Sequence, residues 1–200
     1  MSSTFWDERY SGEGLVYGAA PNEFLAGVAD RLPKAGRALD IGAGEGRNAL
    51  FLASRGLDVL AVDQSEVGMR KAARLAGERG LALRVQAVDL REFDAAPGSF
   101  DVVSSIFVHL PADLRARVHG RLRSWLRPGG VFVLEAYAPD QIARGTGGPK
   151  DPALLASLDV IVSELVGLEI EHRAALVRDV VEGAFHSGVA SVVQVVARKR

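Results

Sequence analysis

Three aspartates in the first half of the chain could hold a polar ligand together. Asp40, Asp63 and Asp89 each end an apolar segment that is typical of a buried strand. In an open α/β sheet, ligands bind at the carboxyl ends of the strands, beside the point where the strand order reverses. We therefore expect the three carboxylates at one rim, where they suit a ligand with an amine, a ribose diol and an exocyclic amino group.

A glycine-rich turn follows the first of these aspartates. Gly42, Gly44 and Gly46 stand at alternate positions, and a helix-compatible run begins at Asn48. Glycines let the backbone approach a ligand closely, and the N–H groups at a helix start can face electron-rich atoms. A diphosphate fits less well, because Glu45 lies inside the turn. The alternative for this stretch alone is an ordinary glycine-rich connection between a strand and a helix.

The surrounding elements alternate between strand and helix. Apolar spacing and capping residues predict helices at 22–32, 48–55, 65–79 and 114–126, and strands at 38–41, 57–63, 81–89, 100–107 and 131–137. A turn at Pro128-Gly129-Gly130 leads into the last of these strands. This alternation predicts an α/β fold with a doubly wound, mostly parallel sheet.

The end of the chain has a different pattern. A polar loop at 139–156 and a helix at 157–166 precede two predicted strands, 168–182 and 189–198. The six residues between these strands are too few for a helical crossover, so the pair must be antiparallel. The sequence therefore predicts a seven-stranded sheet that finishes in an antiparallel hairpin.

A nicotinamide-binding domain of an NAD(P)-dependent oxidoreductase is the chief competing interpretation. It also needs a glycine turn with an acidic residue about twenty positions later, and Asp63 fits that position. Its fingerprint needs a small residue at position 47, where this chain has Arg47, with Gly46 one place early. The antiparallel terminal hairpin also disagrees with that class.

Bulk composition excludes several other classes of site and partner. The 200 residues suit one domain, and a net charge of −1 offers no general attraction to nucleic acid or to an anionic membrane. The chain has no cysteine, which excludes disulfides, thiolate metal sites and cysteine nucleophiles. We expect no metal, no signal peptide and no membrane span, and therefore a cytoplasmic protein, either a monomer or a homodimer.

The glycine turn resembles the first motif of class I S-adenosylmethionine-dependent methyltransferases. Within that group the chain looks most like the small tellurite-resistance and thiopurine methyltransferases. The segments that carry this closer likeness are Trp6-Asp7-Glu8-Arg9-Tyr10, Tyr17-Gly18 with Pro21-Asn22, Gly46-Arg47-Asn48, 145–151, Glu182-Gly183, His186, Gly188 and 192–194. The first motif is specific for the fold, whereas these segments suggest a subgroup without fixing a substrate.

The resemblance implies a role for each matching position. The methionyl part of S-adenosylmethionine is expected at Asp40, Gly42, Ala43, Gly44, Ser105 and Ile106, and Asn48 is a further expected cofactor-binding residue. Asp63 would accept from the ribose hydroxyls with Gln64 beside the adenine, while Asp89 and the Leu90 backbone would meet the adenine amino group and a ring nitrogen. The product would be S-adenosylhomocysteine.

The expected methyl acceptor is a small molecule, such as a thiol, a chalcogen oxyanion or another soft or anionic nucleophile. Such acceptors need no general base, whereas an alcohol or an amine would need one, such as His109, His186 or Glu135. A helix-start residue and a solvated turn residue are the plain alternatives for the two histidines. Arg144 and Arg178 could attract an anionic acceptor, although surface arginines are common. A module that binds the cofactor without catalysis is the third possible function.

An aromatic segment precedes the cofactor core. Residues 1–20 form this arm, 21–137 the core, and 138–200 the substrate loop, helix and hairpin. Trp6, Tyr10 and Tyr17 lie in the arm with no helical or strand period of their own. The arm either packs on the domain as plain structure or covers the acceptor site, and the two possibilities are compatible.

Overall fold

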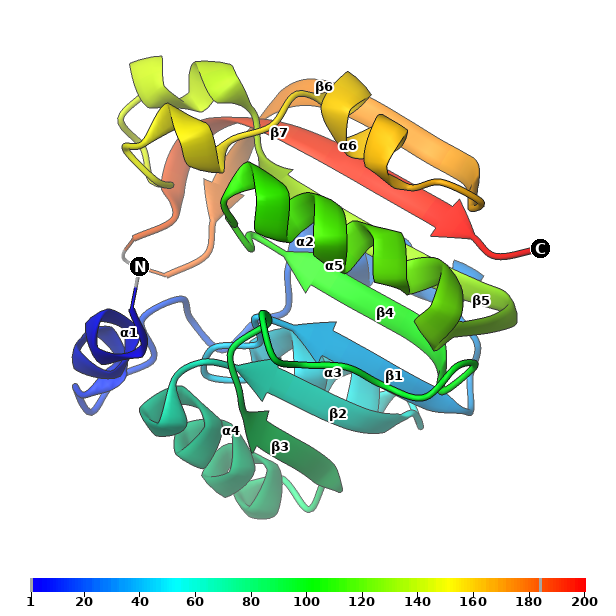
Figure 1. Cartoon of the computed structure of the whole chain (residues 1–200). Coiled ribbons are helices and arrows are strands. Elements are labelled where there is room, and N and C mark those ends of the chain that lie inside the picture. The colour runs from blue at the N-terminus through cyan, green and yellow to red at the C-terminus, as the bar shows by residue number, and fades with distance from the viewer. Residues whose placement is uncertain (1, 184) are drawn as a thin grey trace.

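A seven-stranded sheet forms the centre of the computed structural model, which describes residues 2–183 and 185–200. Its strands are β1 (Arg37–Ile41), β2 (Asp58–Asp63), β3 (Leu83–Ala87), β4 (Phe100–Ile106), β5 (Leu126–Tyr137), β6 (Glu169–Val181) and β7 (Ser187–Arg198). They lie in the order β3-β2-β1-β4-β5-β7-β6 (Figure 1). The first five strands pair in parallel, and β7 runs antiparallel to both β5 and β6. The predicted doubly wound sheet with an antiparallel terminal hairpin is confirmed.

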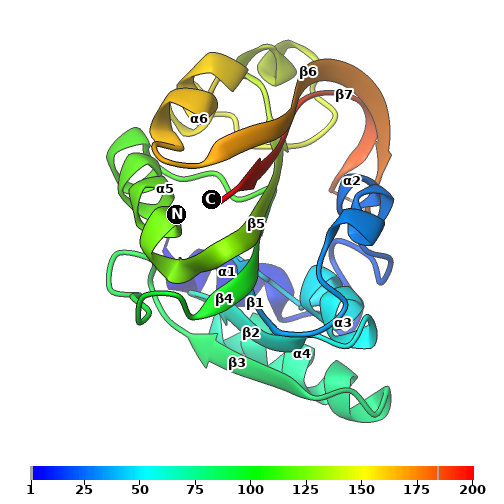
Figure 2. The same ribbon diagram turned by 90° about the vertical axis from the view of Figure 1, so that its right-hand side faces the viewer.

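Helices cover both faces of this sheet. They are α1 (Ser3–Tyr10), α2 (Glu23–Gly27), α3 (Arg47–Ser54), α4 (Glu66–Glu78), α5 (Ala112–Trp125) and α6 (Leu158–Glu164), with 3₁₀ turns at Ala29–Arg31, Pro139–Ala143 and Pro152–Leu154. Figure 2 shows α2 and α3 on one side and α5 and α6 on the other. Each side has its own core: Leu52 and Met69 pack in one, and Leu122 and Trp125 in the other.

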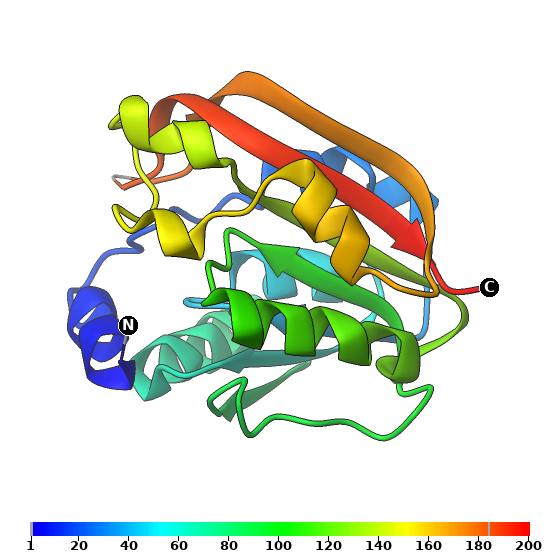
Figure 3. The same cartoon turned by 45° about the horizontal axis from the view of Figure 1, so that its top comes forward.

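The sheet creates a binding edge where its strand order reverses, between β1 and β4. The carboxyl ends of these two parallel strands point to the same side of the molecule. Helix α1 and the turn between β6 and β7 lie at that edge as well, whereas the C-terminus lies on the opposite side of the molecule (Figure 3).

The arm has a helix that the sequence pattern did not predict. Ser2 caps α1 by accepting a hydrogen bond from the Phe5 N–H at 3.3 Å, and Arg9 lies in its last turn. Trp6 and Tyr10 are four residues apart and stack with ring centroids at 5.7 Å. These aromatic residues pack against each other and the domain, and this contact rather than an apolar stripe stabilises the helix.

Three other element boundaries differ from those predicted. The first long helix breaks at Val28 into α2 and a 3₁₀ turn. Strand β3 ends at Ala87, two residues before Asp89. Strand β5 already begins at Leu126, which pairs with Phe100, so the Pro-Gly-Gly segment is an irregularity inside the strand rather than a turn before it.

Candidate cofactor and acceptor site

A cavity of about 700 Å³ lies at the carboxyl ends of the parallel strands, between α1 and the β6–β7 turn. This volume suits a small-molecule site. It brings together most of the predicted site residues: Trp6, Tyr10, Tyr17, Gly42, Ala43, Gly44, Asn48, Asp63, Gln64, Asp89, Leu90, Ile106, His109 and His186. Their convergence follows from the topology, because the strand ends and both terminal segments share one edge.

Asp63 stands at the end of β2, directly beside the glycine turn. Its Oδ2 accepts the Gly44 N–H and its Oδ1 accepts the Ser65 N–H, both at 2.9 Å. Burial raises the pKa of this carboxyl, and the two backbone donors oppose that shift. Each oxygen keeps a second lone pair, so a pair of ligand hydroxyls can donate to a carboxylate that is already held in place.

Gly44 shows how tightly the turn is enclosed. Its φ of 55° lies in the left-handed region, and a Cβ there would stand 2.7 Å from the Tyr10 hydroxyl oxygen. Any side chain at this position would therefore collide with the arm. Tyr10 is buried against the turn, which makes the arm one wall of the cavity.

Asp89 lines the cavity together with Arg91, a residue that sequence reasoning did not include. Arg91 Nη2 donates to Asp89 Oδ2 at 2.6 Å, and its Nε lies 3.1 Å from both carboxylate oxygens. This guanidinium lowers the pKa of the Asp89 carboxyl. A ligand amino group at Asp89 would therefore meet a carboxylate that is ionised and shared with Arg91.

Three predicted site residues do not line the cavity. Asp40 is buried beneath the turn, where Ser104 Oγ donates to its Oδ1 at 2.6 Å. Burial raises the pKa of Asp40 to about 7, and its Oδ2 has no partner among the described residues. Ser105 is buried in β4, whereas Arg144 is exposed beyond the 3₁₀ turn at Pro139–Ala143. These three residues therefore do not line the cavity, and their predicted ligand contacts stay predictions.

Glu45 and Asp7 fasten the arm to the domain. Glu45 accepts the Val16 N–H at 2.7 Å and pairs with Lys71 Nζ at 2.8 Å. Asp7 Oδ1 accepts from Ser65 Oγ at 2.6 Å and from the Val67 N–H at 3.0 Å, which satisfies the start of α4. The arm therefore packs on the domain at both of its ends, and it also lines the cavity.

Aromatic rings and cations form the other end of the cavity. His186 packs between Tyr17 and Phe107, with ring centroids at 4.5 and 4.8 Å. The guanidinium of Arg9 lies 4.2 Å from the centroid of the Phe185 ring. This end is apolar, and its cationic neighbours favour a soft or negatively charged ligand.

The two histidines in the cavity are poor bases. His109 Nε2 accepts the Tyr137 N–H at 3.2 Å, and the Phe107 carbonyl hydrogen-bonds to the same ring. His186 Nδ1 is buried without a partner among the described residues. Burial lowers the pKa of each ring to about 3. The neighbouring His186 ring lowers the pKa of His109 further, and Arg47 and Arg9 lower the pKa of His186 further. Both rings are neutral at pH 7.

A buried network of charged side chains joins α3 to the hairpin of β6 and β7. The sequence analysis did not predict this network. Arg47 of α3 pairs with Glu182, whose other oxygen accepts from Asn22 Nδ2 at 2.8 Å. Arg178 Nη2 bridges Glu135 at 2.7 Å and Glu182 at 3.2 Å. Glu135 and Arg178 are committed to these pairs, so neither is the base or the acceptor-binding cation that the sequence suggested. The one signal in the sequence was Arg47 itself, a large residue where a dinucleotide site needs a small one.

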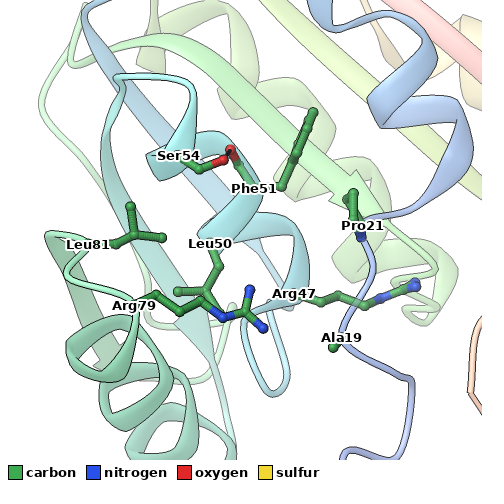
Figure 4. Close-up of a pocket in the computed structure, with 8 residues that line it drawn as sticks. All are labelled: Ala19, Pro21, Arg47, Leu50, Phe51, Ser54, Arg79 and Leu81. Carbon is green, nitrogen blue, oxygen red and sulfur yellow. Dashed lines mark hydrogen bonds between the residues drawn. The ribbon is translucent and has the colours of Figure 1, made fainter.

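Arg47 also borders a second, smaller hollow of about 340 Å³ behind α3. Figure 4 shows Arg47 beside Ala19 and Pro21, with Arg79, Leu50 and Phe51 on the other side. Arg47 thus lines both this hollow and the main cavity, and its Nη1 is buried without a partner among the described residues.

Two further properties hold for residues 2–183 and 185–200. No helix in these ranges has both the length and the apolar composition needed to cross a membrane. Within the same ranges, the acidic and histidine side chains form no cluster that could hold a metal ion.

Comparisons with known proteins show what the fold is similar to. A doubly wound sheet ending in an antiparallel hairpin, with a glycine turn and an acidic residue at the end of β2, is the arrangement of class I methyltransferases. Residues 38–130 match a family model described as a methyltransferase domain. Solved structures of S-adenosylmethionine-dependent methyltransferases from Methanosarcina mazei and Mesorhizobium loti share this fold, with TM-scores of 0.72 and 0.66 at 18% and 21% identity.

Individual relatives and solved structures are similar over different shares of the chain. A 2-heptyl-1-hydroxyquinolin-4(1H)-one methyltransferase from Mycobacteroides abscessus is 31% identical over 52% of this chain and 50% of its own length. A structure titled for the conversion of a disulfide bond into a thioacetal group during echinomycin biosynthesis has a TM-score of 0.76, with 22% identity over 98% of this chain and 92% of that one. TehB from Haemophilus influenzae has a TM-score of 0.70, with 14% identity over 99% and 67%.

These comparisons have limits. The chain spans 33% to 56% of the length of the curated relatives it matches. The likeness to TehB is one of fold, so membership of the tellurite-resistance subgroup stays a prediction from the sequence segments.

Proposed function

We propose that this chain transfers the methyl group of S-adenosylmethionine to a small acceptor whose nucleophilic atom is already ionised. A thiolate, a chalcogen oxyanion or another soft or anionic nucleophile fits this description. The observation that carries the proposal is the state of His109 and His186, because both line the cavity and neither is a competent base. A general base works best when its pKa lies near the working pH, and a pKa of about 3 is far below it.

The residues at one end of the cavity fit the cofactor. Asp63 has free lone pairs for the ribose hydroxyls, and Asp89 with Leu90 can meet the adenine edge. The backbone from Gly42 to Gly44 can hold the methionyl part, beside Asn48. When bound, S-adenosylmethionine supplies a methyl group on a sulfonium, which is an electrophile without help from an acid.

The opposite end of the cavity supports the proposed acceptor class. Arg9 and Lys150 line it among aromatic rings, so an anionic group gains attraction and the reacting atoms lose water. The protein then contributes mainly proximity and orientation, which can supply roughly 7–11 kcal/mol of barrier reduction. The Mycobacteroides relative is named for a small hydroxyquinolinone acceptor, which agrees with a small-molecule substrate.

A panel of matched acceptors tests this proposal. An aromatic thiol, its alcohol counterpart and its amine counterpart are incubated with the protein and S-adenosylmethionine, and S-adenosylhomocysteine is quantified by chromatography. We expect turnover with the thiol and with selenite-type oxyanions, and little with the alcohol or amine. Faster turnover of the alcohol or amine would contradict the proposed acceptor class, and binding without turnover of any acceptor would favour a non-catalytic module.

Ligand-induced stabilisation separates the cofactor assignment from the acceptor class. S-adenosylhomocysteine at a hundred times its Kd should add about 2.7 kcal/mol to the unfolding free energy, which raises the melting temperature. NADH should leave the melting temperature unchanged. A shift with NADH alone would support the oxidoreductase interpretation instead.

A further inference from the structure

The outer edge of β6 has no partner strand among the residues that the structure describes. Strand β6 is the last in the strand order and pairs with β7 alone (Figures 1 and 2). The Glu182 N–H donates to the His186 carbonyl at 2.7 Å, toward the β7 side. Backbone groups alternate sides along a strand, so the odd-numbered residues from 173 to 181 direct theirs outward. A long unpaired edge of this kind is a template for another strand.

The side chains at this edge follow a symmetric pattern. Arg173, Ala175, Val177 and Asp179 are all exposed, and Val177 keeps 52% of its surface accessible. The cation Arg173 and the anion Asp179 are equally far from Leu176 along the strand, and the apolar residues Ala175 and Val177 are its two neighbours. Neither charged member forms an ion pair with another residue that the structure describes. The Asp179 carbonyl accepts from Arg178 Nη1 at 2.9 Å, which leaves its second lone pair free.

We propose that a second copy of this chain pairs with β6 in antiparallel orientation, about a two-fold axis at Leu176. Arg173 then lies opposite Asp179 of the second copy, and Asp179 lies opposite its Arg173. Ala175 faces Val177 of the second copy in the same way, and the two sheets become continuous. Such an interface is self-complementary, as a two-fold dimer requires, and opposite charges in directly facing positions stabilise an antiparallel pair.

Neighbouring registers are less favourable. With the axis at Ala175, Glu171 would face Asp179, which brings two negative charges together, and Arg173 would face Val177. With the axis at Val177, Ala175 would face Asp179 and Arg173 would face Val181. On the other face of the strand, the axis at Leu176 places Leu176 opposite itself and Ala174 opposite Arg178, with no like charges. The register at Leu176 is the one that gains both ion pairs. This dimer goes beyond the proposed methyl transfer and does not depend on it.

Charge reversal and its rescue test the dimer. Analytical ultracentrifugation of the wild type should give about 43 kDa, twice the 21.3 kDa of one chain. Arg173→Asp and Asp179→Arg each place like charges in facing positions twice, and each variant alone should dimerise at least tenfold more weakly. An equimolar mixture of the two variants restores both opposite-charge pairs, so it should return to the wild-type mass. Lys34→Asp, a reversal at an exposed site away from β6, should leave the mass unchanged.

Circular dichroism and the melting temperature of each variant show that it is folded before its mass is interpreted. A wild type that stays at 21.3 kDa up to submillimolar concentration would overturn the proposal. So would a dimer that survives both reversals, or a mixture that stays monomeric while its two components are folded.

Discussion

Replacing Glu182 with glutamine tests whether the buried network of charged side chains stabilises the packing of the β6–β7 hairpin against α3. The Glu182 side chain is 2% exposed and receives Arg47, Asn22 and Arg178. In Glu182→Gln, Asn22 keeps an acceptor and Arg178 keeps Glu135, but Arg47 loses its carboxylate inside the protein. Removing one partner of a buried pair costs about 3–5 kcal/mol of unfolding free energy.

Urea unfolding followed by circular dichroism measures that cost. At about 3 kcal/mol, and with an m-value of roughly 2 kcal/mol per molar urea, the midpoint should fall by about 1.5 M. Glu78→Gln is the matched control, because Glu78 pairs with Arg74 on the surface and both side chains are more than half exposed. Its midpoint should move by less than about 0.5 M, in line with the small contribution of surface pairs. Equal midpoints for the two variants would refute a structural role for the network.

Three further predictions concern the cavity. Asp63→Asn should weaken S-adenosylhomocysteine binding by about 2–4 kcal/mol, because a neutral amide replaces the carboxylate that accepts from the ribose diol. Titration calorimetry measures this change, and an unchanged Kd would place the ribose elsewhere. Asp7→Ala should lower the unfolding free energy by about 1 kcal/mol and weaken the same binding several-fold, because α1 loses its hold on α4; wild-type affinity would show that the arm is packing alone. Folding lowers the pKa of His186 to about 3. Below pH 6.5 the unfolded chain therefore binds a proton at this ring that the folded protein does not bind, and the unfolding free energy falls as the pH falls. The unfolding free energy of the wild type relative to His186→Gln should therefore fall by about 1.4 kcal/mol per pH unit below 6.5, whereas a constant difference would contradict the burial of the ring.

The sequence predicted the fold because its signals are local and repeated. Apolar runs ending at Asp40 and Asp63, separated by helical spacing, define parallel strands that share one carboxyl edge. The short connection between the last two strands left antiparallel pairing as its one outcome. The helix in the arm escaped prediction because its aromatic residues pack on each other and on α4, a contact that no periodicity records. The irregularity in β5 was not predicted for a similar reason, because it depends on the pairing of Leu126 with Phe100 of β4.

Site residues could be predicted from the sequence where their place depends on the end of a strand. Residues whose role depends on an ion-pair partner far away in the sequence could not be predicted. Asp63 and Asp89 reach the cavity because they end or follow their strands. Glu135, one candidate base, and Arg178, one candidate cation for an anionic acceptor, instead pair with each other in the interior. Arg115 on α5 is likewise buried against Glu164 of α6. Pairings between residues more than forty positions apart cannot be deduced from one sequence.

The central claim, that the acceptor ionises by itself, is tested most directly by the pH dependence of kcat/KM. Two aromatic thiols with the same skeleton but different pKa values are compared over the pH range in which the protein stays folded. When neither His109 nor His186 takes the acceptor's proton, the midpoint of each profile should follow the pKa of its own acceptor, and His109→Gln should leave both midpoints in place. A common midpoint for the two thiols, which moves when His109 or His186 is replaced, would contradict the account and assign the proton to the protein.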